Sequence, residues 1–146
     1  MKQILCLFMV TFVFMACEKV RNQNDAEIQQ FISDNNLNAI AAQDGLYYVI
    51  DSVGTGTSPN LSNSIEVKYT GYYTDGEQFD GTPPTVTRSF PLANLIKGWQ
   101  YGFPYFNAGG SGKLLIPSHL GYGSNPPSGI RSDAVLIFDV ELVSVQ

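Results

Sequence analysis

Hydrophobic and polar residues alternate most regularly in two segments, residues 65–73 and 134–145, and such alternation is typical of half-buried β-strands. In residues 65–73 the odd-numbered positions, from Ile65 to Tyr73, are apolar or small, and the even-numbered ones are polar apart from Tyr72. In residues 134–145 we expect the apolar residues Leu136, Phe138, Val140 and Leu142 to face the core and the charged residues Asp139 and Glu141 to face away. Each segment therefore predicts a strand with one buried face and one solvated face.

Three further strands follow from shorter patterns, at residues 46–53, 78–80 and 113–117. The sequence Asp-Gly in the turn at residues 74–77 readily adopts the positive φ angles of tight hairpins, so the segment before it should pair with the segment after it. Residues 81–89 contain Pro-Pro, which excludes a central strand and predicts an exposed loop or a bent edge strand.

One segment has a helical pattern inside the domain: Leu92, Leu95, Ile96 and Trp99 share one face at spacings of i, i+3, i+4 and i+7. Pro104 should end that helix near residue 103, because proline cannot occupy a helix interior without losing a hydrogen bond. The only tryptophan of the chain has two interpretations on this pattern. It either fills the core or forms the floor of an apolar pocket at the edge of the core.

The first residues resemble a targeting signal. Lys2 precedes an apolar run over residues 4–16. This run is too short to span the bilayer as a helix, which requires about 20 residues. The phrase Phe-Met-Ala-Cys at residues 14–17 resembles a bacterial lipobox, so we expect residues 1–16 to be a lipoprotein signal and Cys17 to carry lipid. An ordinary signal peptide cut nearby and a buried hydrophobic N-terminus are the alternatives.

Residues 17–44 are mostly polar and predict a spacer with one short amphipathic helix, from Asp25 to Asn35. Ile28, Phe31 and Ile32 would share its apolar face, and Asn24 or Asp25 would cap its N-terminus. A helix of about three turns is marginal alone in water, so it must dock on the domain or remain a loose tether.

The domain proper should occupy residues 45–146, as an antiparallel α+β fold with a sheet of five to six strands and one short helix. A composition of 44% hydrophobic and 14% charged residues favours a folded chain. The net charge of −5 makes nucleic acid a poor partner, since binding phosphates requires clustered cations. One histidine, His119, offers too little for a metal site, and neither a metal nor another cofactor is expected.

Seven phrases, in order, resemble the FKBP-type peptidyl-prolyl cis-trans isomerases and cover roughly residues 45–146. They are VKYTG at 67–71, GEQFD at 76–80, FPL at 90–92, IKGW at 96–99, IP at 116–117, LGYG at 120–123 and VLIFDVEL at 135–142. With the lipobox and spacer, the chain resembles FKBP-type lipoproteins of Bacteroidetes-like bacteria. Such a protein would be anchored on the periplasmic or cell-surface side of a membrane.

The resemblance implies a half-barrel sheet wrapped over the short helix, with a pocket between them. It implies that Ile96 lies at the helix start, with the helix itself beginning near Lys97, so that a backbone N–H is free to bind. The catalytic residues it implies are Tyr69, Phe79, Asp80, Trp99, Tyr122 and Phe138. The substrate-binding residues it implies are Phe90, Leu95, Ile96 and Ile130.

The function implied is isomerisation of X–Pro bonds during folding of extracytoplasmic proteins, with macrolides as candidate inhibitors. Two alternatives remain: an FKBP-like module that binds peptides or a partner with little turnover, and an unrelated all-β surface lipoprotein that binds glycan or protein. The chain departs from the family pattern at Arg88, Arg131 and Ser132 and in the aromatic segment 101–106. These departures bear on substrate preference and rate.

Overall fold

The structure is a computed structural model that describes residues 2–146 and, within the first sixteen, only the side chain of Met15. It contains one antiparallel sheet in the order β1-β2-β6-β7-β3-β4, with β5 also paired to β3. The strands are β1 (Ile40–Ala41), β2 (Tyr47–Ser52), β3 (Ser64–Tyr72), β4 (Gln78–Gly81), β5 (Arg88–Pro91), β6 (Gly110–Ile116) and β7 (Leu136–Val145). The α-helices are α1 (Lys2–Asp34) and α2 (Lys97–Gly102), and 3₁₀ turns occupy Gln43–Gly45, Leu92–Asn94, Phe103–Tyr105 and Ser118–Leu120.

The predicted antiparallel α+β fold is confirmed, with seven strands in place of five or six. One additional strand is β1, whose two residues lie in the predicted spacer and pair with β2. The other is β5, a short strand that begins inside the segment expected to be a loop or a bent edge and pairs with β3 through four residues. Backbone pairing of this kind needs no long apolar pattern, so alternation alone did not separate these strands from loops.

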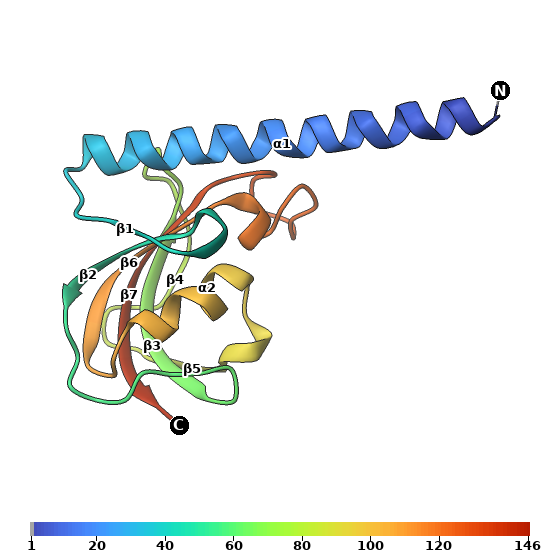
Figure 1. Cartoon of the computed structure of the whole chain (residues 1–146). Helices are drawn as coiled ribbons and strands as arrows, with labels where there is room; N and C mark the ends of the chain where they lie inside the picture. The colour runs from blue at the N-terminus through green and yellow to red at the C-terminus, as the bar shows by residue number, and fades with distance from the viewer. Residues whose placement is uncertain (1) are drawn as a thin grey trace.

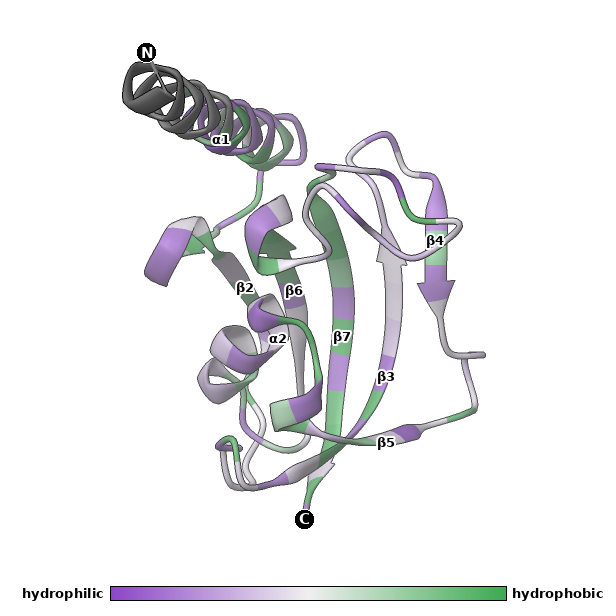
Figure 2. Ribbon diagram, turned by 90° about the vertical axis from the view of Figure 1, so that its right-hand side faces the viewer, coloured by the Kyte–Doolittle hydropathy of each residue, from purple (hydrophilic) through white to green (hydrophobic). Residues whose placement is uncertain are grey.

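The two clearest predicted strands, β3 and β7, lie side by side near the middle of the sheet, as Figure 2 shows. Buried and half-buried residues alternate along β3 throughout its length. On β7, Leu136, Phe138, Val140 and Leu142 are buried as expected. Because Gly71 pairs with Phe138, the phenyl ring has room that any larger residue on β3 would occupy.

Helix α2 packs closely against β6 and covers one face of the curved sheet (Figure 2). Two glycines one turn apart make this approach possible. A Cβ at Gly98 would lie 2.6 Å from Cδ1 of Ile116, and one at Gly102 would lie 2.5 Å from Cδ2 of Leu114. The helix begins at Lys97 with Ile96 as its N-cap residue, as the family resemblance implied, so the wider helical reading of residues 92–99 is wrong. It ends at Gly102, just before Phe103, and Pro104 lies in a 3₁₀ turn.

Helix α1 differs from the short spacer helix predicted for Asp25–Asn35. It is one continuous helix from Lys2 to Asp34 and projects well beyond the domain on its N-terminal side (Figure 1). Asn24, expected to cap a helix, is instead an interior residue whose side chain is bonded to the domain. The C-terminal end agrees with the prediction, since Asn36 adopts a positive φ of 51° just beyond the helix.

The last turns of α1 dock on the face of the sheet opposite α2. Ile28 is fully buried there, in a cluster with Val49, Leu115, Val135 and Ile137, and Phe31 and Ile32 pack against this cluster. Strand β7 therefore buries residues on both faces at this end, which explains why Ile137 interrupts its polar face. The C-terminal part of α1 is therefore docked on the domain and is not a loose tether.

The predicted signal comprises residues 1–16, and of their side chains the structure describes only that of Met15. Within the described residues, no helix combines the length and the apolar character that crossing a membrane requires. Cys17 is exposed on α1 with a free thiol.

Candidate functional site

A cavity of about 260 Å³ opens between α2 and the sheet. Most of its walls are aromatic or aliphatic, with two charged groups. Its lining residues are Tyr69, Asp80, Arg88, Phe90, Leu95, Ile96, Trp99, Tyr122 and Phe138. These come from β3, β4, β5, the start of α2, β7 and the loop between β6 and β7, so the cavity forms only when the whole domain folds.

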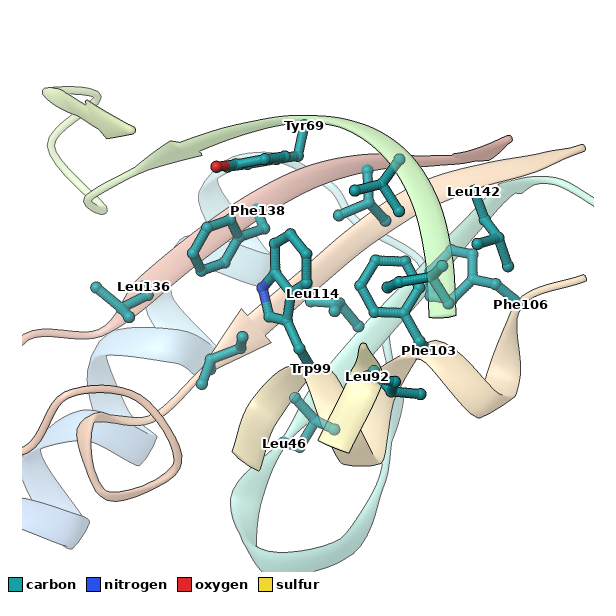
Figure 3. Close-up of a cluster of buried hydrophobic side chains, with 14 of the residues drawn as sticks. Leu46, Tyr69, Leu92, Trp99, Phe103, Phe106, Leu114, Leu136, Phe138 and Leu142 are labelled. Atoms are coloured by element: carbon teal, nitrogen blue, oxygen red, sulfur yellow. The ribbon is translucent and has the colours of Figure 1, made fainter. Parts of the chain in front are cut away.

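Trp99 lies at the bottom of this cavity and is only 4% exposed. Its ring meets those of Tyr69 and Phe138 nearly edge to face, with centroids 5.1 and 5.2 Å away and interplanar angles of 88° and 87°. Phe103 supports it from the core side at 4.9 Å (Figure 3). Edge-to-face contacts fix aromatic rings in orientation, so the floor of the cavity is rigid. Trp99 thus both belongs to the core and lines the cavity.

Ile96 brings a backbone donor to the cavity wall. As the N-cap residue of α2 it lies where helix N–H groups have no intrahelical partner. Among the described residues no group accepts a hydrogen bond from its N–H. The preceding turn is held by the buried side chain of Gln100, whose Nε2 donates to the carbonyls of Ala93 at 3.0 Å and Leu95 at 2.8 Å. The free N–H is therefore preorganised.

Tyr69 and Asp80 form a hydrogen-bonded pair at the rim. The tyrosine hydroxyl donates to Oδ2 of the carboxylate at 3.0 Å, and the Gly81 N–H donates to Oδ1 at 2.8 Å. Burial, together with the adjacent carboxylate, raises the pKa of Tyr69 to about 12. The hydroxyl thus remains a donor at any physiological pH. With both oxygens of Asp80 engaged, the carboxylate orients groups rather than serving as a free base.

Tyr122 reaches the cavity from the long loop between β6 and β7. Burial raises the pKa of its hydroxyl, and the negative charge of Asp80 adds to this effect. The far end of the loop is fastened to the turn between β3 and β4, because Arg131 pairs with Asp75 at 2.7 Å and Glu77 at 2.5 Å. Because its pKa is raised, the Tyr122 hydroxyl is a neutral hydrogen-bonding group inside an apolar cavity.

Comparison with known proteins decides the family. Residues 56–143 match the family described as FKBP-type peptidyl-prolyl cis-trans isomerase. The chain belongs to this FKBP-type family. The match includes every residue that lines the cavity.

Two relatives of this chain are similar to it over most of its length. The FKBP-type peptidyl-prolyl cis-trans isomerase FkpA of Aeromonas hydrophila is 34% identical over 134 residues, covering 88% of this chain and 48% of the relative. The outer membrane protein MIP of Legionella longbeachae is 32% identical over 132 residues, covering 88% of this chain and 57% of the relative. The chain thus spans about half the length of these two relatives.

Solved FKBP-type structures share the fold. FkpA from Escherichia coli superposes with a TM-score of 0.73 at 29% identity, covering 99% of this chain and 71% of that one. A peptidyl-prolyl cis-trans isomerase from Pseudomonas syringae pv. tomato gives a TM-score of 0.74 at 26% identity, covering 88% of this chain and 95% of that one. The second structure is matched almost throughout its length, so nearly all of its fold is present in this chain.

Most of the residues implied by the FKBP resemblance meet at the cavity, and two do not line it. Phe79 lies behind the wall, edge to face with Phe138 at 5.5 Å, and also contacts Tyr73. Ile130 is half-buried in the loop and donates its N–H to the carbonyl of Pro127. Phe79 therefore packs against a residue that lines the cavity, Phe138, and does not line the cavity itself.

Arg88 also lines the cavity. The sequence indicates it only as a departure from the family pattern that bears on substrate preference and rate, and not as a residue of the site. Its position two residues before Phe90 on β5 places both side chains on one face of the strand, and this was the available signal. Of the extra aromatic residues at 101–106, Phe103 and Phe106 are core, whereas Tyr105 is exposed and stacks on Tyr48.

Proposed function

We propose that this chain is a peptidyl-prolyl cis-trans isomerase that accelerates rotation about X–Pro bonds in proteins folding outside the cytoplasm. The observation that carries the proposal is the aromatic cavity floored by Trp99, with the N–H of Ile96, which has no acceptor among the residues described, on its wall. FkpA relatives that are described as isomerases support it.

The barrier to rotation comes from amide resonance, which gives the C–N bond partial double-bond character and amounts to about 18–20 kcal/mol. Resonance places negative charge on the carbonyl oxygen, and water stabilises that charge. An aromatic cavity removes the water, so the twisted state, in which resonance is lost, becomes less unfavourable relative to the planar state. No bond is broken and no proton is transferred. A site with few ionisable groups suits this reaction.

Each group in the cavity has a role in this scheme. The aromatic rings of Trp99, Phe90 and Phe138 enclose the proline ring. The N–H of Ile96 and the hydroxyl of Tyr122 hold substrate carbonyls, which fixes the peptide while the imide bond rotates. Asp80 keeps the Tyr69 hydroxyl directed away from the proline.

The test is a protease-coupled assay with an X–Pro peptide. Wild-type protein at micromolar concentration should accelerate isomerisation, and Trp99→Leu should remove most of the acceleration. Phe106→Leu is the matched control, because Phe106 is 1% exposed but does not line the cavity. Its rate should match wild type. Peptide binding without acceleration would favour the alternative of an FKBP-like binding module, and absence of both would refute the site.

We also propose that the protein is a lipoprotein anchored through Cys17, on the periplasmic or cell-surface side of a membrane. Cys17 is exposed, and the side chains of α1 become buried only at Asn24. The turns between them form a helical spacer of roughly 10 Å, since an α-helix rises about 1.5 Å per residue. A relative described as an outer membrane protein supports this location. Cys17→Ser should move the protein from the membrane fraction to the soluble fraction, and unchanged fractionation would contradict anchoring.

A further inference from the structure

The loop that carries Tyr122, residues 117–135, has few anchors in the core. Residues 124–125, 127–129 and 131–132 are exposed, and the loop contains three glycines. A segment of this length with little buried surface opens easily unless hydrogen bonds restrain it. For Tyr122 to keep one position in the cavity, the loop must be fixed close to that residue.

Besides the ion pairs of Arg131, the loop is fixed at Gly123, the residue after Tyr122. Its N–H donates to the carbonyl of Ser118 at 2.9 Å, and its carbonyl accepts from the N–H of Asp133, also at 2.9 Å. Gly123 has a φ of 63°, and Asp133 has a φ of 53°. A positive φ is uncommon for a residue with a side chain. Both ends of the loop therefore meet beside Tyr122, in a backbone geometry that needs external support.

Asn24 of α1 supplies that support. Its Oδ1 accepts from the N–H of Ser118 at 2.7 Å, and its Nδ2 donates to the carbonyl of Asp133 at 3.1 Å. The side chain is 4% exposed. The four hydrogen bonds form a closed ring through Asn24, Ser118, Gly123 and Asp133. The primary amide of Asn24 has an acceptor and a donor side by side, whereas an ionised aspartate lacks the donor and leucine lacks both, so neither can complete the ring.

We propose that Asn24 is a positioning residue for Tyr122, through which α1 holds the substrate-binding loop in its active geometry. This inference rests on the proposed function, because it assigns Tyr122 a substrate contact. Docking of α1 has a separate basis, since Ile28 packs on the sheet in a cluster with Leu115 and Ile137. The helix expected to be a spacer is therefore also a support of the site.

The first test uses the full chain with Asn24→Leu and Asn24→Asp, and with Ile28→Val as the matched control four residues along α1. Asn24→Leu should lower kcat/KM about tenfold, the ratio expected when a buried hydrogen-bonding group loses its partner. Amide exchange in residues 118–133 should rise in the same variant. Asn24→Asp retains the acceptor for Ser118 but sets a carboxylate oxygen against the carbonyl of Asp133, so it should show a change of the same kind. Both variants are compared at a temperature at which they remain folded.

Ile28→Val should lower the free energy of unfolding while leaving kcat/KM and loop exchange at wild-type values. If the Asn24 variants also lower only the unfolding free energy, Asn24 is merely a docking contact and the proposal is wrong. Loop exchange equal to wild type in both Asn24 variants would overturn it as well.

The second test combines Asn24→Leu with Tyr122→Phe. If Asn24 acts through Tyr122, removing the hydroxyl first should reduce the effect of Asn24→Leu to less than about twofold, because residues in one network are not additive. A further full tenfold loss would show that Asn24 acts elsewhere. Should wild-type protein not catalyse at all, the proposed function fails, whereas loop exchange in Asn24→Leu against Ile28→Val still decides the positioning role.

Discussion

Gly98→Ala should disturb the cavity floor more than any other single methyl group added to α2. The new Cβ would lie 2.6 and 2.8 Å from Cδ1 and Cγ1 of Ile116 and closer still to its Cγ2, and Ile116 is itself fully buried. Real Cβ atoms do not approach so closely, so α2 must move away from β6 or Ile116 must change its rotamer. Trp99 follows directly in the chain, and outward movement of α2 would carry its ring with it.

Overpacking of a core costs about 1–3 kcal/mol. Replacing glycine by alanine inside a helix returns up to about 1 kcal/mol, because alanine restricts the unfolded chain. Because Ile116 is fully buried and the contact is so close, the cost should lie in the upper part of that range, about 2–3 kcal/mol, and the net loss in unfolding free energy should be about 1–2 kcal/mol. Urea unfolding measures this loss as a lower midpoint at an unchanged m-value. The activity should fall as well, since the ring that forms the floor of the cavity is displaced.

Gly102→Ala is the matched control, because its Cβ would meet Leu114 at 2.5 Å on the same helix face but three residues after Trp99, whereas Gly98 directly precedes it. Both variants should lose similar stability, and only Gly98→Ala should lose much activity in the protease-coupled assay. Adding Ile116→Ala to Gly98→Ala removes the contacting carbons and should restore activity in part. Equal loss of activity in both glycine variants, or no loss of stability in Gly98→Ala, would refute the packing argument.

Three other predictions concern polar groups. Tyr69→Phe should destabilise the fold by about 1 kcal/mol in urea unfolding, since Asp80 loses a half-buried donor. Burial lowers the pKa of His119, so the unfolded chain binds the proton more readily. Stability should therefore fall as pH drops below about 6.5, and His119→Gln should flatten this dependence in thermal unfolding. Arg88→Leu should reduce the relative rate for Glu–Pro over Leu–Pro peptides about threefold, an effect that disappears at high salt.

The strands could be predicted from the sequence wherever one face alone is buried. The alternation in β3 and in the even-numbered positions of β7 gave the correct inward residues, because their outer faces are largely solvated. It failed for Ile137, since the burial of that residue depends on α1, a segment near the opposite end of the chain. The apolar face formed by Ile28, Phe31 and Ile32 indicates that this helix can bury one side, but it does not indicate which strand that side packs against.

The start of α2 shows a different limit. Leu92, Leu95, Ile96 and Trp99 have the spacing of one helical face, yet Leu95 has a ψ of 171° and the helix begins two residues later. The apolar spacing arises because a 3₁₀ turn and a helix both face the same core. Only the order of the motifs, compared with a known family, placed Ile96 correctly at the N-terminus.

Arg88 and Asn24 escaped prediction because their roles are defined by partners rather than by their own segments. Arg88 is a lone cation in a stretch without regular pattern, and Asn24 has a residue type that suits a helix cap. The proposed chemistry itself explains why the site leaves so weak a trace in composition. A reaction that proceeds by desolvation needs a rigid apolar cavity. The residues that line such a cavity have the same residue types and the same sequence patterns as core residues. What separates Trp99 from an ordinary core residue is the cavity that it lines, and that cavity is formed by residues from the whole fold.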